Sequence, residues 1–367
     1  MTFLLSRLGR YVFARVIMGV AIALVAVLIS ILLIDFVEEM KTVGTRTDLS
    51  ALEAARLTLL KTPMLVEQTL PFVMLAGSMM AVIALNRRSE LIAMRASGVS
   101  AWRFLTPPAF VGVLLGILTV TMLNPLGASL YQQFQSSRDT ALSDYASHSA
   151  PPHGVWIRQG DRDGQVVIHA ERVGASGAQL EDATFMFFEM HDDTLRFSRR
   201  MRVGQAELRP GFWQLTNVVE ASPGQPPTHE DHLAIPTSLD ATEMINRFVT
   251  PATLSFWALP SFIQNARQAG FAPTRYELKW QGLLAYPLLL AAMAGLGAAF
   301  SLQLYRLGHL AQWGAAGGGI GLFLFFYGQL AGAFAITQTV PAAVAAWSAP
   351  VAGIFIALAL VAFLEDG

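Results

Sequence analysis

The sequence predicts an α-helical membrane protein with six transmembrane helices, three on each side of an inserted all-β domain. The 367-residue chain is 53% hydrophobic and only 14% charged, and its mean hydropathy is +0.47. Soluble domains carry roughly 25% charged residues, so this chain lacks the polar residues to cover a soluble surface. Charged residues are nearly absent from six long runs. An interval of ordinary polarity separates the third run from the fourth.

The six runs are expected to be transmembrane helices, because each reaches the roughly 20 apolar residues needed to cross the hydrocarbon core. A helix satisfies its own backbone hydrogen bonds in lipid. The first run also resembles a signal peptide, but it is longer than a signal core and lacks a small-residue cleavage site, so a true span is favoured. The expected spans are 16–34, 68–86, 104–126, 280–305, 310–339 and 341–364.

The orientation follows from the arginines in short loops, which mark the cytoplasmic side. The amino terminus and the loops after the second and fourth spans are basic, and an even number of spans brings both termini to that side. We therefore expect cytoplasmic termini and a polar interval on the opposite side. The basic residues are Arg7, Arg10 and Arg15, then Arg87, Arg88, Arg95 and Arg103 against Glu90, then Arg306 with His309.

The polar interval contains short β-type runs at 154–158, 165–169, 183–188 and 200–203, separated by turn residues. Closely spaced strands without helical patterns between them predict an antiparallel sandwich or roll. A short helix fits 255–269, capped by Ser255 and stopped by Gly270. The predicted domains are spans one to three over 1–135, the β domain over 136–250, a connecting helix in 251–279, and spans four to six over 280–367.

Several function classes lose support from what the sequence lacks. The chain has no cysteine, and none of its three lysines follows a glycine as a Walker A loop requires. The net charge of −1 provides no overall attraction to nucleic acid. His229-Glu230-Asp231-His232 has the wrong spacing for a metalloprotease helix and is interpreted as a solvated loop, so no metal site is expected. Glycines four apart, such as Gly112/Gly116 and Gly328/Gly332, predict close helix packing.

The cytoplasmic segment between the second and third spans has the features of a short helix, at about 87–98. Ser89 precedes it and Gly98 is typical of a helix stop. Such a helix is what a permease presents to the groove of a soluble ATPase, where Glu90 would pair with a basic group. The alternative is an interfacial helix that binds no partner, and the residues alone leave both interpretations open.

The run Arg88-Ser89-Glu90-Leu91-x-x-Met94-Arg95-Ala96-Ser97-Gly98 resembles the coupling-helix motif of the LptF/LptG permeases of the lipopolysaccharide export ABC transporter. The resemblance covers nearly the whole chain, and residues 262–270 with Arg275-Tyr276-Glu277-Leu278 look more like the LptG branch than the LptF branch. It implies a periplasmic β-jellyroll and a location in the inner membrane of a diderm bacterium. The residues it assigns to ATPase coupling are Arg88, Glu90, Leu91, Met94, Arg95 and Gly98.

The resemblance also implies partners and a task. An LptF-like permease, an LptB-like ATPase dimer and an LptC-like subunit with one transmembrane helix and a jellyroll would assemble with this chain. Together they would extract lipopolysaccharide from the outer leaflet of the inner membrane and pass it to a periplasmic bridge toward the outer membrane. The chain itself is expected to be no enzyme and to hold no cofactor, because ATP and Mg²⁺ would bind the partner ATPase.

Substrate contacts are expected in two places. At the outer end of the first span, the headgroup candidates are Asp35, Glu38, Lys41 and Arg46. The family often has a basic residue where this chain has Asp35, so either Lys41 and Arg46 substitute for it or the acids bridge to phosphate through divalent cations. In the β domain the candidates for an apolar groove are Trp156, Phe185, Phe187 and Trp213, although an ordinary core is the favoured interpretation for any one of them.

Three other functions remain as alternatives. A permease of the lipoprotein-releasing or FtsX type usually has its large outer domain after the first span, whereas here it follows the third. An intramembrane enzyme would need polar catalytic residues in the spans, where the sequence offers almost none; Glu67 lies at the outer edge of the second. A non-transporting envelope scaffold would have no need of an ATPase-docking helix.

Overall fold

The computed structural model describes residues 6–42, 50–146, 155–160, 164–174, 179–191, 194–224, 226–237, 250–268, 272–307 and 310–366. The chain divides into two compact units. The helical unit comprises Met1–Leu142, Leu254–Leu259 and Thr274–Gly367, and the second unit, which holds the β-sheet, comprises Ser143–Thr253 and Pro260–Pro273.

The six predicted spans are confirmed in the described part of the chain, where six helical segments are long and apolar enough to cross a membrane. The third combines two α-helices and a π-helical turn. The helical elements are α2 (Arg7–Thr42), α3 (Ala51–Arg87), α4 (Glu90–Ala96), α5 (Ala101–Leu118), the π-helix η1 (Thr119–Leu123), α6 (Asn124–Ala146), α9 (Thr274–Leu307), α10 (Leu310–Ile336) and α11 (Ala342–Asp366).

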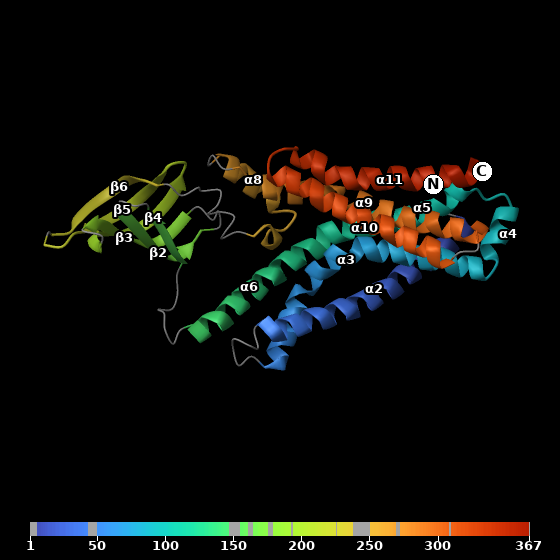
Figure 1. Cartoon of the computed structure of the whole chain (residues 1–367), viewed down its shortest axis with the longest axis horizontal. Coiled ribbons are helices and arrows are strands. Elements are labelled where there is room, and N and C mark those ends of the chain that lie inside the picture. The colour runs from blue at the N-terminus through green and yellow to red at the C-terminus, as the bar shows by residue number, and fades with distance from the viewer. Residues whose placement is uncertain are drawn as a thin grey trace. The chain divides into compact units, whose positions relative to one another are not determined.

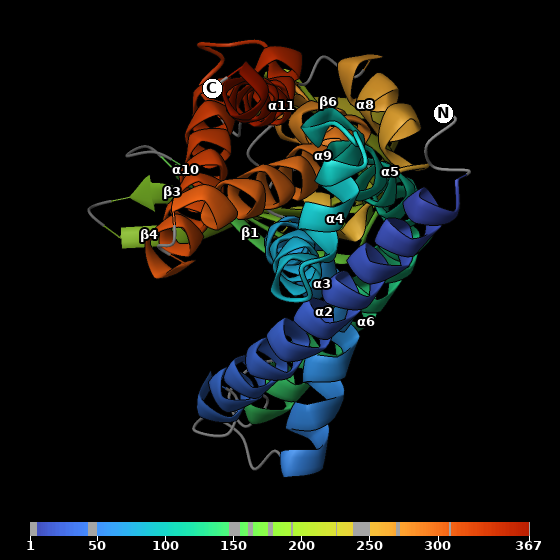
Figure 2. The same cartoon turned by 90° about the vertical axis from the view of Figure 1, so that its right-hand side faces the viewer.

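Helix α9 is the centre of the helical unit. It packs against α3, α5, α10 and α11, whereas α2 contacts mainly α3 and α5. Viewed along the bundle, α3 and α9 lie between α2 on one side and α10 with α11 on the other (Figure 2). The first turns of α2, the end of α11 and the short helix α4 share one end of the bundle (Figure 1).

Small residues permit the closest helix contacts, as expected in lipid. A Cβ atom added to Gly112 would lie 2.6 Å from the backbone nitrogen of Ala291, and one at Gly116 would meet the Cα of Pro287. The predicted packing role of this glycine pair is therefore confirmed between α5 and α9. Gly19 and Gly77 permit an equally close contact between α2 and α3, which the sequence analysis did not single out.

Helix α6 continues to Ala146, ten residues beyond the predicted start of the β domain at 136. The stretch after Ser136 is polar but contains neither glycine nor proline before Pro151, so nothing in it ends the helix earlier. The π-helical turn η1 lies midway along this segment, between α5 and α6. The β domain begins with β1 only at Val155.

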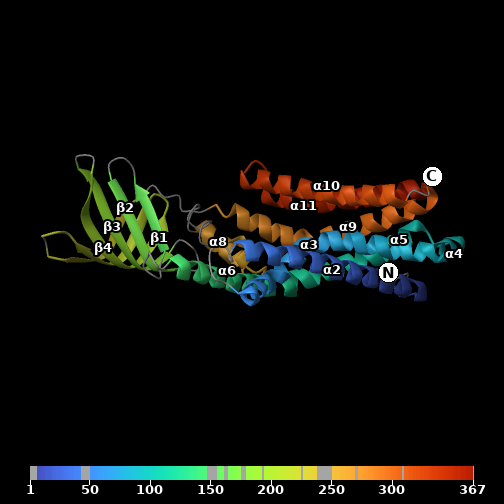
Figure 3. The ribbon, with the colours of Figure 1, turned by 60° about the horizontal axis from the view of Figure 1, so that its bottom comes forward.

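The second unit is built on one antiparallel sheet in which each strand pairs with its neighbours in sequence (Figure 3). Thr237, just after β6, donates a hydrogen bond from its hydroxyl to the side chain of Gln159 in β1, so the two edge strands approach each other at one end. The inserted all-β domain is confirmed, and its six described strands form one curled meander. The strands are β1 (Val155–Gly160), β2 (Gly164–Val173), β3 (Gln179–His191), β4 (Thr194–Arg209), β5 (Phe212–Ala221) and β6 (Thr228–Pro236).

Two local predictions in this region were wrong. His229 to His232 lie in strand β6, paired with β5, and not in a loop; all four side chains are exposed, so this edge strand shows no apolar alternation. The predicted helix at 255–269 begins later, because Ser255 caps a turn and α8 (Leu259–Gln268) starts where Pro260 fits the first helical turn. Its expected stop at Gly270 lies outside the described residues. The remaining helix is the 3₁₀ turn η2 (Pro251–Thr253).

Candidate functional sites in the two units

Helix α4 forms where the sequence predicted a short helix between the second and third spans. Ser89 precedes it, and Gly98 ends it with a φ of +86°, a conformation that favours glycine. Leu91 and Met94 face inward and are 2% and 8% exposed, whereas Ile92 is 40% exposed. The outward face of α4 therefore consists of Ile92 and its neighbours, and the two motif residues Leu91 and Met94 hold the helix on the bundle.

The Glu90 carboxylate is linked to α2 through a short chain of hydrogen bonds. The Tyr11 hydroxyl donates to Glu90 Oε2 at 2.7 Å and accepts from the Arg15 Nε and Nη2 atoms at 3.0 and 2.7 Å. The Arg15 guanidinium also lies 5.1 Å from the centre of the Tyr11 ring. This chain orients α4 relative to the first span, and sequence reasoning missed it because 79 residues separate Tyr11 from Glu90.

Arg88, like Arg87, is exposed beside α4, and Arg95 is partly buried. Trp102 at the start of α5 is 40% exposed. This end of the bundle thus combines cations with the exposed apolar side chains Ile92 and Trp102, and we call these four exposed residues, Arg87, Arg88, Ile92 and Trp102, the α4 surface.

At the other end of α2, Asp35 and Glu39 face α3 and form a buried ionic cluster with Lys61. The Lys61 ammonium lies 2.6 Å from Asp35 Oδ1 and 3.0 Å from Glu39 Oε1. The second carboxylate oxygen of each acid is buried without a hydrogen-bond partner. Sequence reasoning found Asp35 but missed Glu39 and Lys61; the spacing of the two acids by four residues was the available signal, since it places both on one helix face.

The ring of Phe134 in α6 contacts two cations beside this ionic cluster, Lys61 and Arg138. Its ring centre lies 5.0 Å from the Lys61 ammonium and 5.8 Å from the Arg138 guanidinium. Cations over an aromatic face are stabilised by the ring quadrupole. Of the other predicted headgroup residues, Glu38 and Lys41 are exposed on α2, and Arg46 lies outside the described residues.

A second polar group lies where the apolar runs of α3 and α9 begin. Asn124, directly after η1, donates from Nδ2 to Glu67 Oε2 at 3.0 Å, and its Oδ1 accepts from the backbone nitrogen of Phe256 at 2.8 Å. Lys279 donates to the carbonyl oxygen of Leu254 at 2.8 Å. The chain returning from the β domain is thereby hydrogen-bonded to the spans. Asn124 within an apolar run was the sequence signal that could have indicated this site.

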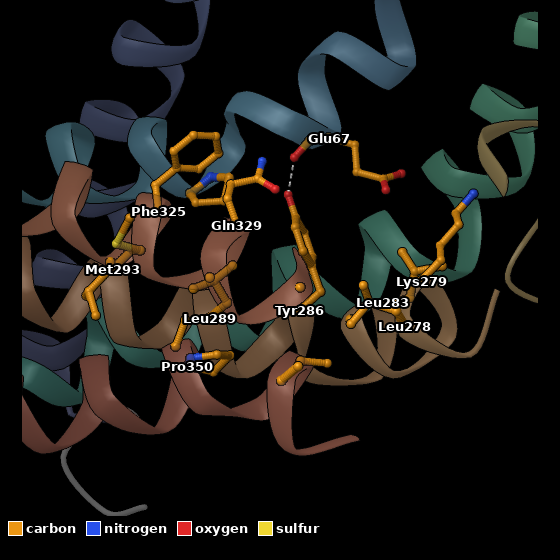
Figure 4. Close-up of a pocket in the computed structure, with 18 residues that line it drawn as sticks. Glu67, Leu278, Lys279, Leu283, Tyr286, Leu289, Met293, Phe325, Gln329 and Pro350 are labelled. Carbon is orange, nitrogen blue, oxygen red and sulfur yellow. Dashed lines mark hydrogen bonds between the residues drawn. The ribbon is translucent and has the colours of Figure 1, made fainter. Parts of the chain in front are cut away.

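Glu67 and Lys279 also line a cavity of about 430 Å³ between α3, α9, α10 and α11. Tyr286 lies beside them and donates a hydrogen bond from its hydroxyl to the Glu67 carbonyl (Figure 4). The two charged side chains lie toward one end of the cavity, and Met293 and Phe325 line the other (Figure 4). Most of the remaining lining is apolar or small.

In the β domain, the predicted groove aromatics divide into core and surface. Phe185 and Trp213 are fully buried and contact each other edge to face, with ring centres 5.7 Å apart. Phe187 is partly buried, with the Arg199 guanidinium 4.7 Å from its ring, and Trp156 is 51% exposed against His169. The buried pair belongs to the sheet core, which leaves Trp156 and Phe187 accessible to a ligand.

Exposed ion pairs lie on the surface of the same sheet. Arg172 donates to Glu181 Oε2 at 3.0 Å and to Asp182 Oδ2 at 2.9 Å. The hydrogen bond to Glu181 and the negative charge of Asp182 raise the pKa of Arg172. Within the described residues, no group of three or more histidine, aspartate or glutamate side chains could hold a metal ion.

Comparison with known proteins places this geometry in context. A family model described as lipopolysaccharide export system permease LptF/LptG matches residues 10–362. The chain is 25% identical over 348 residues to the lipopolysaccharide export system permease protein LptG of Haemophilus influenzae, covering 92% of this chain and 93% of that protein. It is 23% identical over 265 residues to LptG of Escherichia coli K12, covering 71% of each.

Proposed function

The chain belongs to the LptF/LptG family of lipopolysaccharide export permeases, and we propose that it occupies the LptG position of the transporter and moves lipopolysaccharide out of the outer leaflet of the inner membrane. The observation that carries this proposal is the family match over residues 10–362, together with the order of three spans, a β domain and three spans. That order argues against permeases in which the large outer domain follows the first span.

We assign the α4 end of the bundle to the cytoplasm and the β domain to the periplasm. The basic residues around α4 and at the start of α2 support this orientation. Reporter fusions at Arg95 and at Gly160 should then report opposite sides of the membrane, and fusions that report one side would contradict the assignment.

We propose no cofactor for this chain, so the energy would come from a partner, an LptB-like ATPase that binds ATP and Mg²⁺. The groove of that ATPase would receive the α4 surface. Ile92 and Trp102 would make apolar contacts in the groove, and the positive charges of Arg87 and Arg88 would face an acidic rim. Glu90 would contribute an anion from the edge of the same helix. A second, LptF-like permease and an LptC-like subunit would complete the assembly.

Lipid A phosphates need cations at the outer membrane surface. The Asp35–Glu39–Lys61 cluster is buried and holds two carboxylates against one ammonium, so it would attract phosphate weakly. Lys41, exposed on the other side of α2, is the better headgroup contact of the residues named above. Beyond the membrane, Phe187 lies on the same sheet face as the buried Phe185 and would contact the acyl chains as the lipid passes toward the periplasmic bridge, whereas Trp156 lies on the opposite face.

The central test is copurification of the tagged chain with mass spectrometry, followed by reconstitution in vesicles. We expect an ATPase, a second permease and bound lipid A in one complex, and ATP-dependent release of lipopolysaccharide from the vesicles to added periplasmic partners. An assembled complex that hydrolyses ATP but never releases the lipid would contradict the proposed task.

The role of Glu90 can be separated from that of its hydrogen-bond partner. If Glu90 contacts the ATPase, Glu90→Ala should weaken ATPase binding roughly tenfold, because hydrogen bonds to charged groups are the stronger class. Tyr11→Phe keeps the carboxylate and removes only its internal donor, so it should have a smaller effect on binding measured by surface plasmon resonance. Equal effects would instead make Glu90 a positioning residue for α4.

A further inference from the structure

The cavity between α3, α9, α10 and α11 has no role in the export path proposed above. Its lining residues on α9 recur at helical spacing from Lys279 through Leu283, Tyr286 and Leu289 to Met293. Fourteen residues of helix correspond to about 21 Å at 1.5 Å per residue. One leaflet of the hydrocarbon core is about 15 Å deep, half of roughly 30 Å. The lining of the cavity therefore extends along α9 for more than the depth of one leaflet, which is long enough for a single acyl chain.

The charged end of the cavity lies where a lipid headgroup would be. Glu67 directly precedes the apolar run of α3, and Lys279 directly precedes that of α9. Both side chains therefore lie at the boundary of the hydrocarbon, and they come from the neighbouring helices α3 and α9 at the same end of the cavity (Figure 4). From this boundary the cavity extends to the apolar side chains of Met293 and Phe325.

We propose that this cavity binds one acyl chain of a zwitterionic phospholipid whose headgroup carries a phosphate and a primary ammonium, as phosphatidylethanolamine does. The phosphate would accept hydrogen bonds from Lys279, and the ammonium would donate to Glu67. A lipid with only anionic phosphates, such as lipid A, would bring those charges close to the Glu67 carboxylate, so the paired charges disfavour it. The inference does not depend on the proposed export function.

Small residues make the space for the chain. Gly328 and Gly332 of α10 and Ala345, Ala346 and Ala349 of α11 all line the cavity. A Cβ atom at Gly332 would meet Leu278 at 3.4 Å, an ordinary contact, so a larger side chain fits there only by entering the cavity. Gly318, on the same helix, does not line the cavity and has nothing within 4 Å of an added Cβ. These two glycines form a matched pair.

The test is native mass spectrometry of the purified transporter after incubation with phosphatidylethanolamine or with phosphatidylcholine of the same acyl chains. Phosphatidylcholine keeps the positive charge but has no N–H to donate. We expect roughly tenfold stronger retention of phosphatidylethanolamine. Gly332→Leu should abolish this retention, and Gly318→Leu should leave it unchanged. Glu67→Gln should reduce the preference between the two lipids toward equality.

Three results would overturn the proposal. One is retention of phosphatidylethanolamine by the Gly332→Leu variant at the level of the unmodified chain. Another is equal retention of the two phospholipids by the unmodified chain, a comparison that stands even where Glu67→Gln does not fold. The third is displacement of phosphatidylethanolamine by lipid A in the unmodified chain, together with loss of lipid A retention in Gly332→Leu. That result would assign the cavity to the substrate.

Discussion

Helices α9 and α10 are consecutive in the chain and both are apolar enough to span a membrane, yet their surroundings differ. In the most apolar stretch of α9, 78% of the residues are buried inside the chain. In the most apolar stretch of α10, only 17% are buried. Helix α2 has the same low value as α10. Lipid is as apolar as leucine, so hydrophobicity alone cannot bring a helix to the centre of a bundle.

The difference therefore comes from residue size and from the few polar contacts. In α9 the central turns around Gly297 are rich in alanine and glycine, and every residue from Leu290 to Leu302 is buried. In α10 large side chains such as Phe323 and Phe326, each 61% exposed, point away from the bundle. The central helix α9 is held by close backbone contact and small residues along its length, whereas the peripheral helix α2 makes one such contact at Gly19 and adds an ionic anchor at Lys61.

The largest expected effect tests such an anchor. Lys61→Met removes the cation that holds the outer part of α2 to α3 and leaves the carboxylates of Asp35 and Glu39 buried together. Removing one partner of a buried ion pair costs about 3–5 kcal/mol, so thermal unfolding of the purified transporter in detergent should begin at a clearly lower temperature. Adding Asp35→Asn and Glu39→Gln to the same variant should restore most of the loss, whereas an unchanged midpoint for Lys61→Met alone would contradict the anchor.

An intermediate effect is expected at the central helix. A Cβ atom at Gly297 would collide with the Ser78 hydroxyl and the Leu75 carbonyl, so Gly297→Leu must push α9 away from α3. Overpacking of this kind costs roughly 1–3 kcal/mol, occasionally more. The same unfolding measurement checks it, and a variant as stable as the unmodified chain would show that α3 and α9 do not depend on backbone contact.

The smallest effect is expected at the peripheral helix. Gly318→Leu on α10 meets no neighbouring atom within 4 Å, so the free energy of unfolding should change by no more than roughly 0.5 kcal/mol. Comparing it with Gly297→Leu sharpens the contrast, because the two substitutions are chemically identical. A loss at Gly318 as large as that at Gly297 would mean that another surface covers α10.

Much of the fold could be predicted from the sequence because its signals are local. Six apolar runs, the glycine stop after α4 and the short β-type runs of β1 to β4 each depend on neighbouring residues. Strand β5 was missed although its first half alternates between exposed and buried residues. Strand β6 was missed because its first half is exposed and charged, without apolar alternation. The extension of α6 was missed because a polar helix leaving the membrane has no apolar signal.

The candidate sites were predicted less well than the fold. The α4 motif identified the helix and Glu90, but not that Leu91 and Met94 face the bundle. Among the headgroup candidates, Asp35 was found without its partner Lys61, 26 residues away. Glu67 was noticed as a membrane-edge charge without Asn124, Tyr286 and Lys279.

By itself, the sequence determined that this is a membrane protein of six spans with an inserted β domain, and its α4 motif pointed to the permease family. Desolvation of apolar runs and local turn preferences suffice for these conclusions. Only the tertiary structure decided which charges meet, which span is central and where a cavity remains. These depend on the registry between helices, and in lipid that registry is set by small-residue contacts and buried polar pairs between residues far apart in the chain.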